Sequence, residues 1–230
     1  MPAAQNHLIE LLPRADRQRL LAVCKPVELM LGQVLCERGE PVHDVFLPVN
    51  GFVSQLTQVD RHPSLEVGLV GREGMLGSAL LLGVDTVPLR ALVQGPGAAW
   101  RVGKPDFVRL LAESAALHSL VNRFIFVRMA QMAGQAACLR FHLIGPRLAR
   151  WLLMSQDRAH APDFHVTHEF LASMLGVRRV GVTAAAGVLQ RQGLISYHRG
   201  EVTVRDRSGL EQAACSCYAA DRAVYREHLT

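Results

Sequence analysis

The sequence predicts an α+β fold in three parts: a small antiparallel β domain, a long helix and a C-terminal winged helix-turn-helix. Between Pro26 and about Gly103, short β-prone runs alternate with turn residues, and 11 of the 19 glycines lie there. A helical pattern then continues from Pro105 to about Leu143 without an internal proline. Further on, two short helical patterns meet at Gly176 and lead into a hairpin. We expect the three parts to span residues 1–115, 116–143 and 144–230.

The N-terminal residues are expected to be helical. Residues 6–24 have the pattern of one or two short amphipathic helices, divided at Pro13 because proline disrupts a helix interior. The closely spaced turns that follow are typical of a small antiparallel sandwich or barrel. The apolar contacts of the first helices are expected from Leu8, Ile9, Leu11, Leu12, Leu20 and Leu21.

The long helix is apolar on nearly all sides from about Leu117 onward. Such a helix is either buried in the core of its own chain or shared with a partner. We interpret it as a subunit-interface helix, and the alternative is a core helix of a single chain. Gly145-Pro146 is expected to interrupt the chain after it, and a single final helix is expected over residues 208–229. The predicted interface residues are Leu117, Leu120, Val121, Phe124, Val127, Arg128 and Met132.

Composition excludes several classes of protein. No run approaches the roughly 18 consecutive apolar residues of a membrane span. The N-terminus is too polar and acidic for a signal peptide. We therefore expect a cytoplasmic protein without a membrane partner.

Cysteine usage indicates neither disulfides nor a metal. The five cysteines are odd in number and scattered, so they are not a disulfide framework. No CxxC pair or His/Cys cluster has the spacing of a structural zinc site, and we expect no metal and no cofactor. We interpret Cys215-Ser-Cys217 as small residues near the chain end, and the alternative is a thiol switch.

Positive charge is concentrated in the C-terminal part. Residues 1–139 carry 13 Lys and Arg against 12 Asp and Glu, whereas residues 140–230 carry 12 arginines and no lysine against 8 acids. An excess on one half of a chain suggests an anionic partner there, although a solvated basic surface is the alternative.

Residues 166–195 predict a helix-turn-helix. The Thr167 hydroxyl can accept a hydrogen bond from a backbone N–H at the start of the first helix. Gly176 permits the tight turn, and the small Ala172 allows the two helices to cross closely. Two short strands are expected around Arg199-Gly200, which would make this a winged form.

The exposed face of the second helix predicts contact with DNA. Arg178 and Arg179 lie at its N-terminal end, where a recognition helix meets base edges, and Thr183 lies one turn further. Arginine can bond guanine at O6 and N7. The run from Ala184 to Gly187 carries little bulk, which would let the backbone approach the duplex. The alternative is a helix pair that packs on another domain. Phosphate contacts are expected from Thr167, Arg191, His198 and Arg199.

The order of the parts and two segments resemble the Crp/Fnr transcription regulators over nearly the whole chain. Residues 39–53, GEPVHDVFLPVNGFV, are similar to the family's cyclic-nucleotide-binding-like β-roll, and LGVRRVGVTAAAGVLQRQGLI is similar to its recognition region. The resemblance implies a homodimer joined through its long helix, a palindromic DNA operator and an action on RNA polymerase. Val180 stands where many members have glutamate, so we expect a different operator.

The resemblance also indicates what the chain lacks. Members that bind cyclic nucleotides have a glycine–glutamate pair for the ribose and a downstream arginine for the phosphate. Here Ser78 follows Gly77, Arg90 is displaced by about two positions, and Met132-Ala133 replace the hydroxyls that face adenine. Each lost charge-assisted bond is worth about 1.5–3 kcal/mol. We expect no cyclic AMP binding, and any effector near Gly77, Ser78, Arg90 and Met132 is unidentified.

Other chemistries have less support in the sequence. Only Cys24 and Cys36 lie early in the chain, so the N-terminal cysteine cluster of iron–sulfur members is missing. The segment GREGMLG has neither a P-loop lysine nor a dinucleotide-binding glycine pattern, so we do not expect an enzyme. A second hypothesis is a ligand- or redox-responsive sensor that acts mainly through protein partners. Sequence-preferring binding to genomic DNA would distinguish a regulator from such a sensor.

Overall fold

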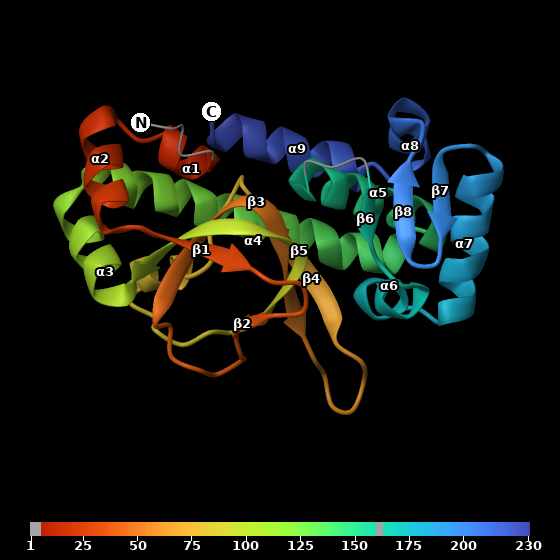
Figure 1. The fold of residues 1–230 in the computed structure, drawn as a ribbon, viewed down its shortest axis with the longest axis horizontal. Helices are drawn as coiled ribbons and strands as arrows, with labels where there is room; N and C mark the ends of the chain where they lie inside the picture. The colour runs from red at the N-terminus through yellow and green to blue at the C-terminus, as the bar shows by residue number, and fades with distance from the viewer. Residues whose placement is uncertain (1–5, 160–162) are drawn as a thin grey trace.

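Two β-sheets lie toward opposite ends of the long helix α4 (Ala115–Phe141), as Figure 1 shows. The structure is a computed structural model that describes residues 6–159 and 163–230. The larger sheet contains β1 (Lys25–Leu29), β2 (Val34–Cys36), β3 (Asp44–Thr57), β4 (Leu65–Val70) and β5 (Arg90–Gly103). The smaller sheet contains β6 (Asp163–His165), β7 (Ile195–His198) and β8 (Glu201–Val204). This arrangement confirms the predicted α+β fold.

The larger sheet is antiparallel, with the strand order β1-β5-β3-β4 and with β2 also paired to β5. Strands β3 and β5 pair from Asp44 opposite Gly103 to Leu56 opposite Arg90, with register shifts along the way. Such bulges increase the local twist and bend the strands, so the sheet curves into a roll. Val53 and Val93 are fully buried inside the roll, while Val45 and Leu47 pack with the helices on its other side.

Short helices close one end of the roll. Helices α1 (His7–Glu10) and α2 (Arg14–Val23) meet at Pro13, as predicted. The Asn6 side chain caps α1 by accepting from the amide of Ile9 and also donates to the carbonyl of Pro48 on β3. A 3-10 helix, η1 (Ser78–Leu82), follows β4 and packs against α3 (Lys104–Glu113) and α4.

The predicted single helix after Pro105 is divided in two, which corrects the prediction. Helix α3 ends at Glu113, and α4 starts at Ala115 after a bend of 109° between the two helices. Ser114 causes the break, because its hydroxyl accepts a hydrogen bond from the amide of Leu117 and its backbone is extended. A serine at this position favours the start of a new helix over continuation of the old one.

The predicted interface residues on α4 lie mostly inside the chain itself, so this prediction was wrong for them. Five of them pack in the core between α4 and the roll, and a residue covered by its own chain cannot also meet a partner. The Arg128 guanidinium donates to the carbonyl of Leu69 and to the side chain of Gln55, and burial lowers its pKa to about 10. Only Met132 stays on the exposed side. The five core residues are Leu117, Leu120, Val121, Phe124 and Val127.

The C-terminal domain surrounds α5 (Ile144–Ala159), α6 (His168–Leu175) and α7 (Arg179–Arg191). Gly145-Pro146 lies within the first turn of α5, where proline is tolerated, and so does not form the separate break that we expected. Strand β6 pairs with β8 and makes the wing sheet three-stranded, whereas the sequence predicted two strands. Leu148, Leu152, Leu171 and Val182 are fully or almost fully buried in this domain's own core.

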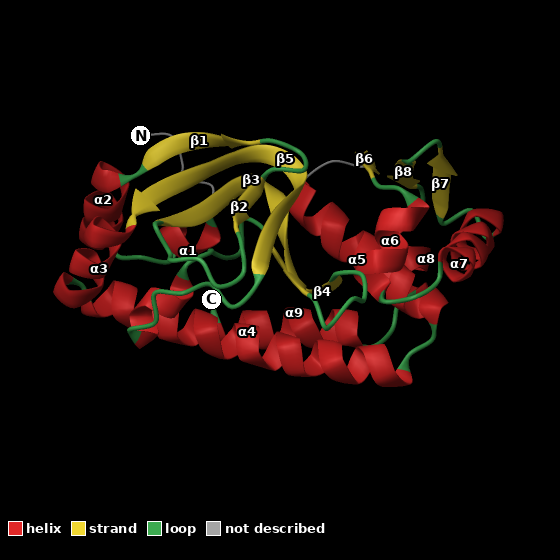
Figure 2. Ribbon diagram, turned by 90° about the horizontal axis from the view of Figure 1, so that it is seen from below, coloured by secondary structure: helices red, strands yellow, loops and turns green. Residues whose placement is uncertain are grey.

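The predicted final helix is also two helices. Helix α8 (Arg207–Ala213) ends before Cys215, and α9 (Cys217–His228) then runs back along α4 toward the N-terminal helices (Figure 2). Leu229 is fully buried in the same core as Leu8 and Phe107, so the end of the chain is part of the N-terminal half. The C-terminal segment therefore joins both halves of the molecule.

Among the described helices, none alone is both long and apolar enough to cross a membrane. Two helix pairs reach that length and composition together, but each pair is bent by more than 100°.

Candidate DNA-binding interface

The helix-turn-helix is fixed by its caps and by its turn. The Thr167 hydroxyl accepts from the amide of Phe170 at 3.1 Å, so the predicted cap of α6 is confirmed. Gly176 ends α6 with a φ of 61°, the left-handed region in which glycine is favoured. Helices α6 and α7 cross at 108°, within the range of a helix-turn-helix.

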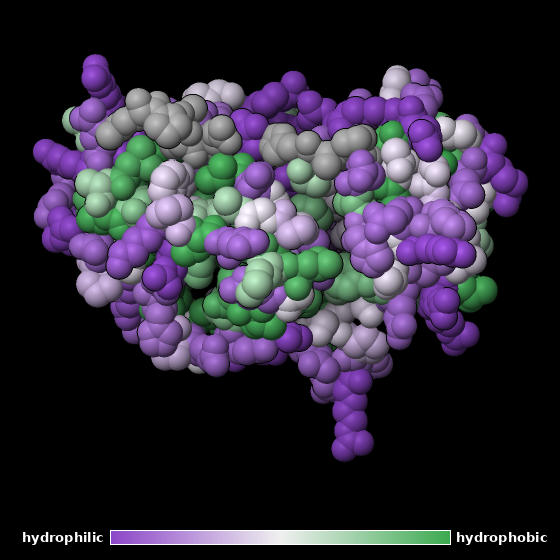
Figure 3. All heavy atoms as spheres, viewed as in Figure 1, coloured by the Kyte–Doolittle hydropathy of each residue, from purple (hydrophilic) through white to green (hydrophobic). Residues whose placement is uncertain are grey.

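Helix α7 buries one side and exposes the other. Val182, Ala186 and Leu189 pack into the domain core at helical spacing. Arg179 and Thr183 lie on the exposed side, which is open to solvent. On the face seen in Figure 3, hydrophilic residues predominate over the end of the molecule that carries α6, α7 and the wing. An exposed polar helix face beside a wing is the expected form of a recognition element.

The small residues of α7 serve two purposes. This corrects the prediction that all of them reduce the side-chain bulk on the side that faces DNA. Ala186 is 3 % exposed and belongs to the core. A Cβ atom at Gly181 would lie 2.8 Å from Cδ1 of Ile144, so this glycine lets α7 approach the start of α5. Ala184 and Gly187 are the small residues that leave room outside the core.

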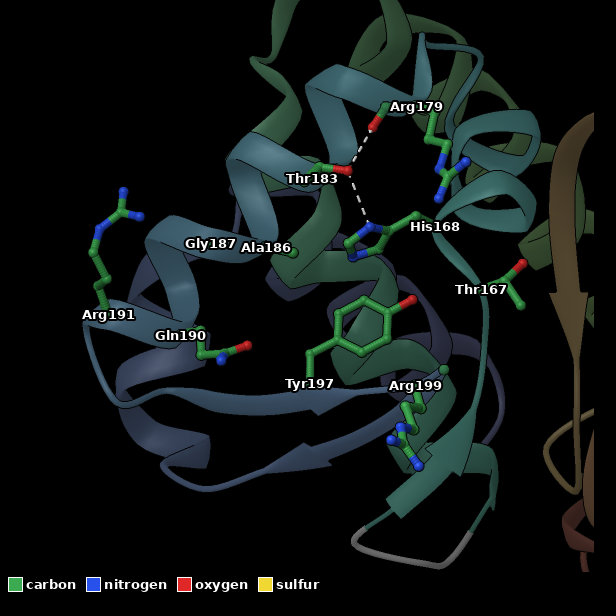
Figure 4. Close-up of a pocket in the computed structure, with 11 residues that line it drawn as sticks. Thr167, His168, Arg179, Thr183, Ala186, Gly187, Gln190, Arg191, Tyr197 and Arg199 are labelled. Atoms are coloured by element: carbon green, nitrogen blue, oxygen red, sulfur yellow. Dashed lines mark hydrogen bonds between the residues drawn. The ribbon is translucent and has the colours of Figure 1, made fainter.

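A groove of about 740 Å³ lies between α7, the start of α6 and the wing (Figure 4). Arg179 and Arg191 come from opposite ends of α7, and Arg199 comes from the wing. None of the described residues that line the groove is acidic, and none of these three guanidinium groups forms an ion pair among the described residues. The groove therefore presents positive charge. Its lining residues are Thr167, His168, Arg179, Thr183, Ala186, Gly187, Gln190, Arg191, Tyr197, Arg199 and Gly200.

The wing turn places Arg199 at its tip. Arg199 and Gly200 both have positive φ, 50° and 88°, between β7 and β8. Two positive φ values in a two-residue loop correspond to a type I′ turn, whose twist matches the flanking strands. A charged residue at this position accepts a disfavoured backbone conformation, although asparagine or glycine would adopt it more readily.

Two aromatic residues and one threonine form the floor of the groove. His168 Nδ1 lies 3.0 Å from Oγ1 of Thr183, which in turn donates to the carbonyl of Arg179 at 3.1 Å. The His168 ring meets the Tyr197 ring edge-on at 4.4 Å between centroids. Burial and the charge of Arg179 lower the pKa of His168, which favours the neutral imidazole. Burial raises the pKa of Tyr197 to about 12, and its hydroxyl donates to the carbonyl of Val166.

The structure brings together most of the residues that we expected to contact DNA. Thr167, Arg179, Thr183, Arg191 and Arg199 line the groove. Arg178 and His198 are exposed but do not line it. His168, Gln190 and Tyr197 also line the groove and were not predicted. Gln190 could have been found, because it lies eleven positions after Arg179 on the same helix face, whereas the pairing of His168 with Tyr197 has no local signal.

The predicted effector residues are only partly together. A cavity of about 250 Å³ in the roll is lined by Gly77 and Ser78 and also by Glu40 and Asp44. Arg90 does not line it, because its guanidinium lies 3.1 Å from the carboxylate of Glu37. Met132 on α4 does not line it either. No arginine or lysine is among the described lining residues, so this cavity lacks the charge that a phosphate needs.

The glycine-rich loop after β4 has a packing explanation. A Cβ atom at Gly71 would lie 2.6 Å from Cγ of Arg158, and one at Gly74 would lie 2.9 Å from the ring of Phe124. These glycines let the loop lie close against α5 and α4. The loop is therefore covered by the chain itself, and the structure gives no support to a phosphate cradle there.

Comparison with known proteins agrees with this architecture. Residues 146–213 match the family described as the Crp-like helix-turn-helix domain. Residues 146–213 therefore contain a Crp-like helix-turn-helix domain. The chain is 24 % identical over 190 residues to a global nitrogen regulator of Synechococcus elongatus, covering 79 % of the chain and 86 % of that protein.

Solved structures of Crp/Fnr-type proteins share the fold. FixK2 from Bradyrhizobium japonicum superposes with a TM-score of 0.71 at 15 % identity, covering 84 % of this chain and 98 % of FixK2. The c-di-GMP responsive global regulator CLP from Xanthomonas campestris superposes with a TM-score of 0.67 at 18 % identity, covering 84 % and 99 %. These similarities show that the chain shares the fold of those proteins, including the β-roll and the long helix.

Proposed function

We propose that this protein is a Crp/Fnr-type transcription regulator that acts as a homodimer, binds a palindromic DNA site with sequence preference and acts on transcription through RNA polymerase. The observation that carries the proposal is the groove beside α7. Three arginines that form no ion pair among the described residues lie there, two on the recognition helix and one on the wing. The phosphate backbone of a duplex is a polyanion that such a groove fits.

The residues of the groove suggest distinct roles. Arg179, at the N-terminal end of α7, is placed to enter the major groove and bond a guanine. The Thr183 hydroxyl is already bonded within the domain, so its methyl group is the part left for an apolar contact with thymine. Arg191, Arg199 and Thr167 are assigned to phosphates, which set the position of the protein without reading sequence. Arg178 and His198 are assigned to flanking phosphates.

The exposed side of α4 supports a homodimer. Seven of its exposed residues are spaced by alternating steps of three and four positions along three successive heptads. This spacing is that of a coiled-coil seam, in which the helices of two subunits pack side by side. The middle of the seam is apolar or small, and Met129 there is 66 % exposed in the single chain. The seam consists of Ser119, Asn122, Phe126, Met129, Ala133, Ala136 and Arg140.

A charge in the seam tests the dimer. Met129→Glu would bury two carboxylates against each other in the dimer, so sedimentation should show a monomer with a folded circular-dichroism spectrum. Arg123→Glu is the matched control, because Arg123 is exposed on the same helix outside the seam, and it should stay dimeric. A dimeric Met129→Glu protein would contradict the proposed interface.

We also propose that cyclic AMP is not the effector. The cavity in the roll offers Glu40 and Asp44 to a phosphate, and these carboxylates would repel it. Titration calorimetry with the purified protein should show no saturable binding of cyclic AMP. Micromolar affinity would contradict this part of the proposal.

Selection of bound fragments from genomic DNA tests the DNA-binding role. Enriched fragments should share two inverted half-sites about one helical turn apart. Mobility shifts at several salt concentrations should then retain a preference for these fragments over random DNA. Binding that lacks preference and vanishes at moderate salt would leave only generic electrostatic attraction, and it would favour a role in docking to protein partners.

A further inference from the structure

Four potential metal ligands meet where the long helix ends. Cys138 and His142 come from the last turn and the C-cap of α4, Cys215 comes from the turn between α8 and α9, and Cys217 is the first residue of α9. Their ligand atoms, three sulfurs and one imidazole nitrogen, all lie within 4.8 Å of one another. Cys138 and Cys215 are buried, and the other two residues are partly buried. We expected no His/Cys cluster with the sequence spacing of a zinc site, and this cluster is formed instead by residues that are far apart in the sequence.

Two of the six distances between the ligand atoms match the edges of a tetrahedron, and all six are within 4.8 Å. Sγ of Cys138 lies 3.6 Å from Sγ of Cys215, and Sγ of Cys217 lies 3.5 Å from Nδ1 of His142. Tetrahedral zinc has Zn–S bonds of about 2.3 Å and Zn–N bonds of about 2.0–2.1 Å, which places neighbouring ligand atoms roughly 3.5–3.8 Å apart. A disulfide needs a separation of about 2.05 Å, so the Cys138–Cys215 pair is in the range for shared coordination and too long for a bond.

The helix supplies two of the ligands on one face. Residues four positions apart lie one above the other along a helix, so Cys138 and His142 point to the same side of α4. Cys215 and Cys217 supply the other two ligands. The amide of Cys215 donates to the carbonyl of Pro146 at 3.2 Å, which holds this segment beside the start of α5. Two pairs of ligands that approach from two segments can enclose an ion completely.

The surroundings suit a site with net negative charge. Three thiolates and one neutral imidazole around a divalent cation carry one negative charge. Nη1 of Arg150 lies 3.6 Å from Sγ of Cys138, and Arg150 is only 6 % exposed. A buried guanidinium beside the sulfurs would donate a hydrogen bond to the Cys138 sulfur and orient this ligand.

We propose that Cys138, His142, Cys215 and Cys217 form a tetrahedral site for zinc. Four protein ligands leave no open position, so the site is structural and not catalytic. Its function is to fasten the turn before α9 to the junction of α4 and α5, where the C-terminal domain begins. Thiolate and imidazole ligands also favour zinc over hard cations such as magnesium or calcium.

Metal content measures the proposal directly. Tag-free protein, purified without chelators, should contain about one zinc ion per chain by elemental analysis. Cobalt(II) substitution should produce the visible absorption of a tetrahedral ion together with thiolate-to-cobalt charge-transfer bands. Cys217→Ser and His142→Ala should each lose most of the bound zinc and weaken or abolish these spectra. Cys36→Ser is the matched control, because Cys36 lies in the β-roll, and it should keep both.

Thermal unfolding distinguishes a bound metal ion from a cluster of cysteine and histidine side chains that only pack together. An ion that binds only the folded chain raises its midpoint temperature, so chelation should lower the midpoint of the wild type and of Cys36→Ser. The same chelator should not change the midpoint temperature of Cys217→Ser. Hydrogen exchange of residues 215–229 should speed up on chelation of the wild type.

Three results would overturn the proposal. The first is a wild-type zinc content no higher than that of Cys217→Ser. The second is a cobalt spectrum without charge-transfer bands. The third is mass-spectrometric detection of a Cys138–Cys215 disulfide in freshly isolated, metal-free protein, which would assign the cluster to thiol oxidation. All three measurements are made without DNA, so they do not depend on the proposed regulatory function.

Discussion

The arginines of the C-terminal half form two groups that differ in their partners. Arg150 and Arg158, on α5, are buried and each meets a carboxylate: Arg150 binds Asp221 at 2.6 Å and Arg158 binds Glu73 at 2.8 Å. Arg179 and Arg199 are exposed beside the groove and have no such partner among the described residues. The charge of Arg150 and Arg158 is therefore balanced inside the chain, whereas Arg179 and Arg199 present their charge at the surface.

The difference indicates two uses of the same side chain. A buried guanidinium must be paired, since an isolated buried charge is strongly disfavoured, and its fork geometry then fixes the elements it joins. An exposed guanidinium without a partner contributes little to folding and stays free for an anion outside the chain. Substitutions in the two groups should therefore change different properties, stability in one and DNA binding in the other.

The largest effect is expected where a buried pair is broken. Asp221→Ala leaves the buried Arg150 without its carboxylate and should lower the free energy of unfolding by about 3–5 kcal/mol, measured by urea denaturation. Glu211→Ala is the control, because its pair with Arg207 is partly exposed and spans one helical turn. That change should cost less than about 1 kcal/mol. Equal losses in both variants would remove the distinction between the groups.

A buried carboxylate between the two halves should make stability depend on pH. Glu66 on β4 accepts from the hydroxyl of Ser54 at 2.6 Å and from Nε1 of Trp151 on α5 at 2.9 Å. Burial raises its pKa from 4.5 to about 7, against the opposing effect of these hydrogen bonds and of Arg158 and Arg150. The folded chain therefore holds a proton between about pH 4.5 and pH 7 that the unfolded chain has released.

The direction in which stability changes with pH follows from this bound proton. The contribution of Glu66 to the free energy of unfolding falls as the pH rises from about 4.5 to 7, and it stays low above that range. Glu66→Gln cannot titrate, so it should gain stability relative to the wild type over the same window, by at most about 3 kcal/mol. Urea denaturation of both proteins at about pH 5 and about pH 8 measures the change. A constant difference between them would show that Glu66 does not titrate there.

A smaller effect is expected in the groove, on specificity. Arg179→Ala should lose about 1–3 kcal/mol of discrimination at one base pair of each half-site, measured by competition between operator variants. Its free energy of unfolding should change by less than about 0.5 kcal/mol, because no partner in the chain is lost. Arg178→Ala is the matched neighbour outside the groove, and it should weaken all sequences alike. Equal losses on operator and random DNA for Arg179→Ala would count against base reading.

Local signals in the sequence predicted most of the elements. Pro13, Thr167 and Gly176 each act through their own backbone and first neighbours, so their positions identified the break, the cap and the turn. Ser114 was missed because serine inside an apolar helical pattern is ambiguous between an interior residue and a cap. Strand β6 was missed because three residues carry too little periodicity to be distinguished from a loop.

Contacts between distant residues could not be predicted in the same way. Cys138 and Cys215 are 77 positions apart, and Glu66 and Trp151 are 85 apart, so no spacing rule connects them. The helix α4 shows the same limit. Its sequence is apolar on several sides, and only the folded chain decides that Phe124 meets the roll while Met129 is exposed. The groove was more predictable, because most of its residues lie on one helix face.

The smallest effect is expected at the tip of the wing, on the salt dependence of binding. Arg199→Asn removes the charge while keeping a residue that tolerates the φ of 50° at this position, whereas alanine would add backbone strain. Loss of one phosphate contact should reduce the slope of log affinity against log salt by about 0.9 and weaken operator and random DNA alike. Arg205→Asn removes an exposed arginine that does not line the groove, and its slope should match the wild type. If Arg199→Asn keeps the wild-type slope, or if both variants lower it equally, the wing does not contact phosphate. The free arginines that define the groove would then be limited to α7.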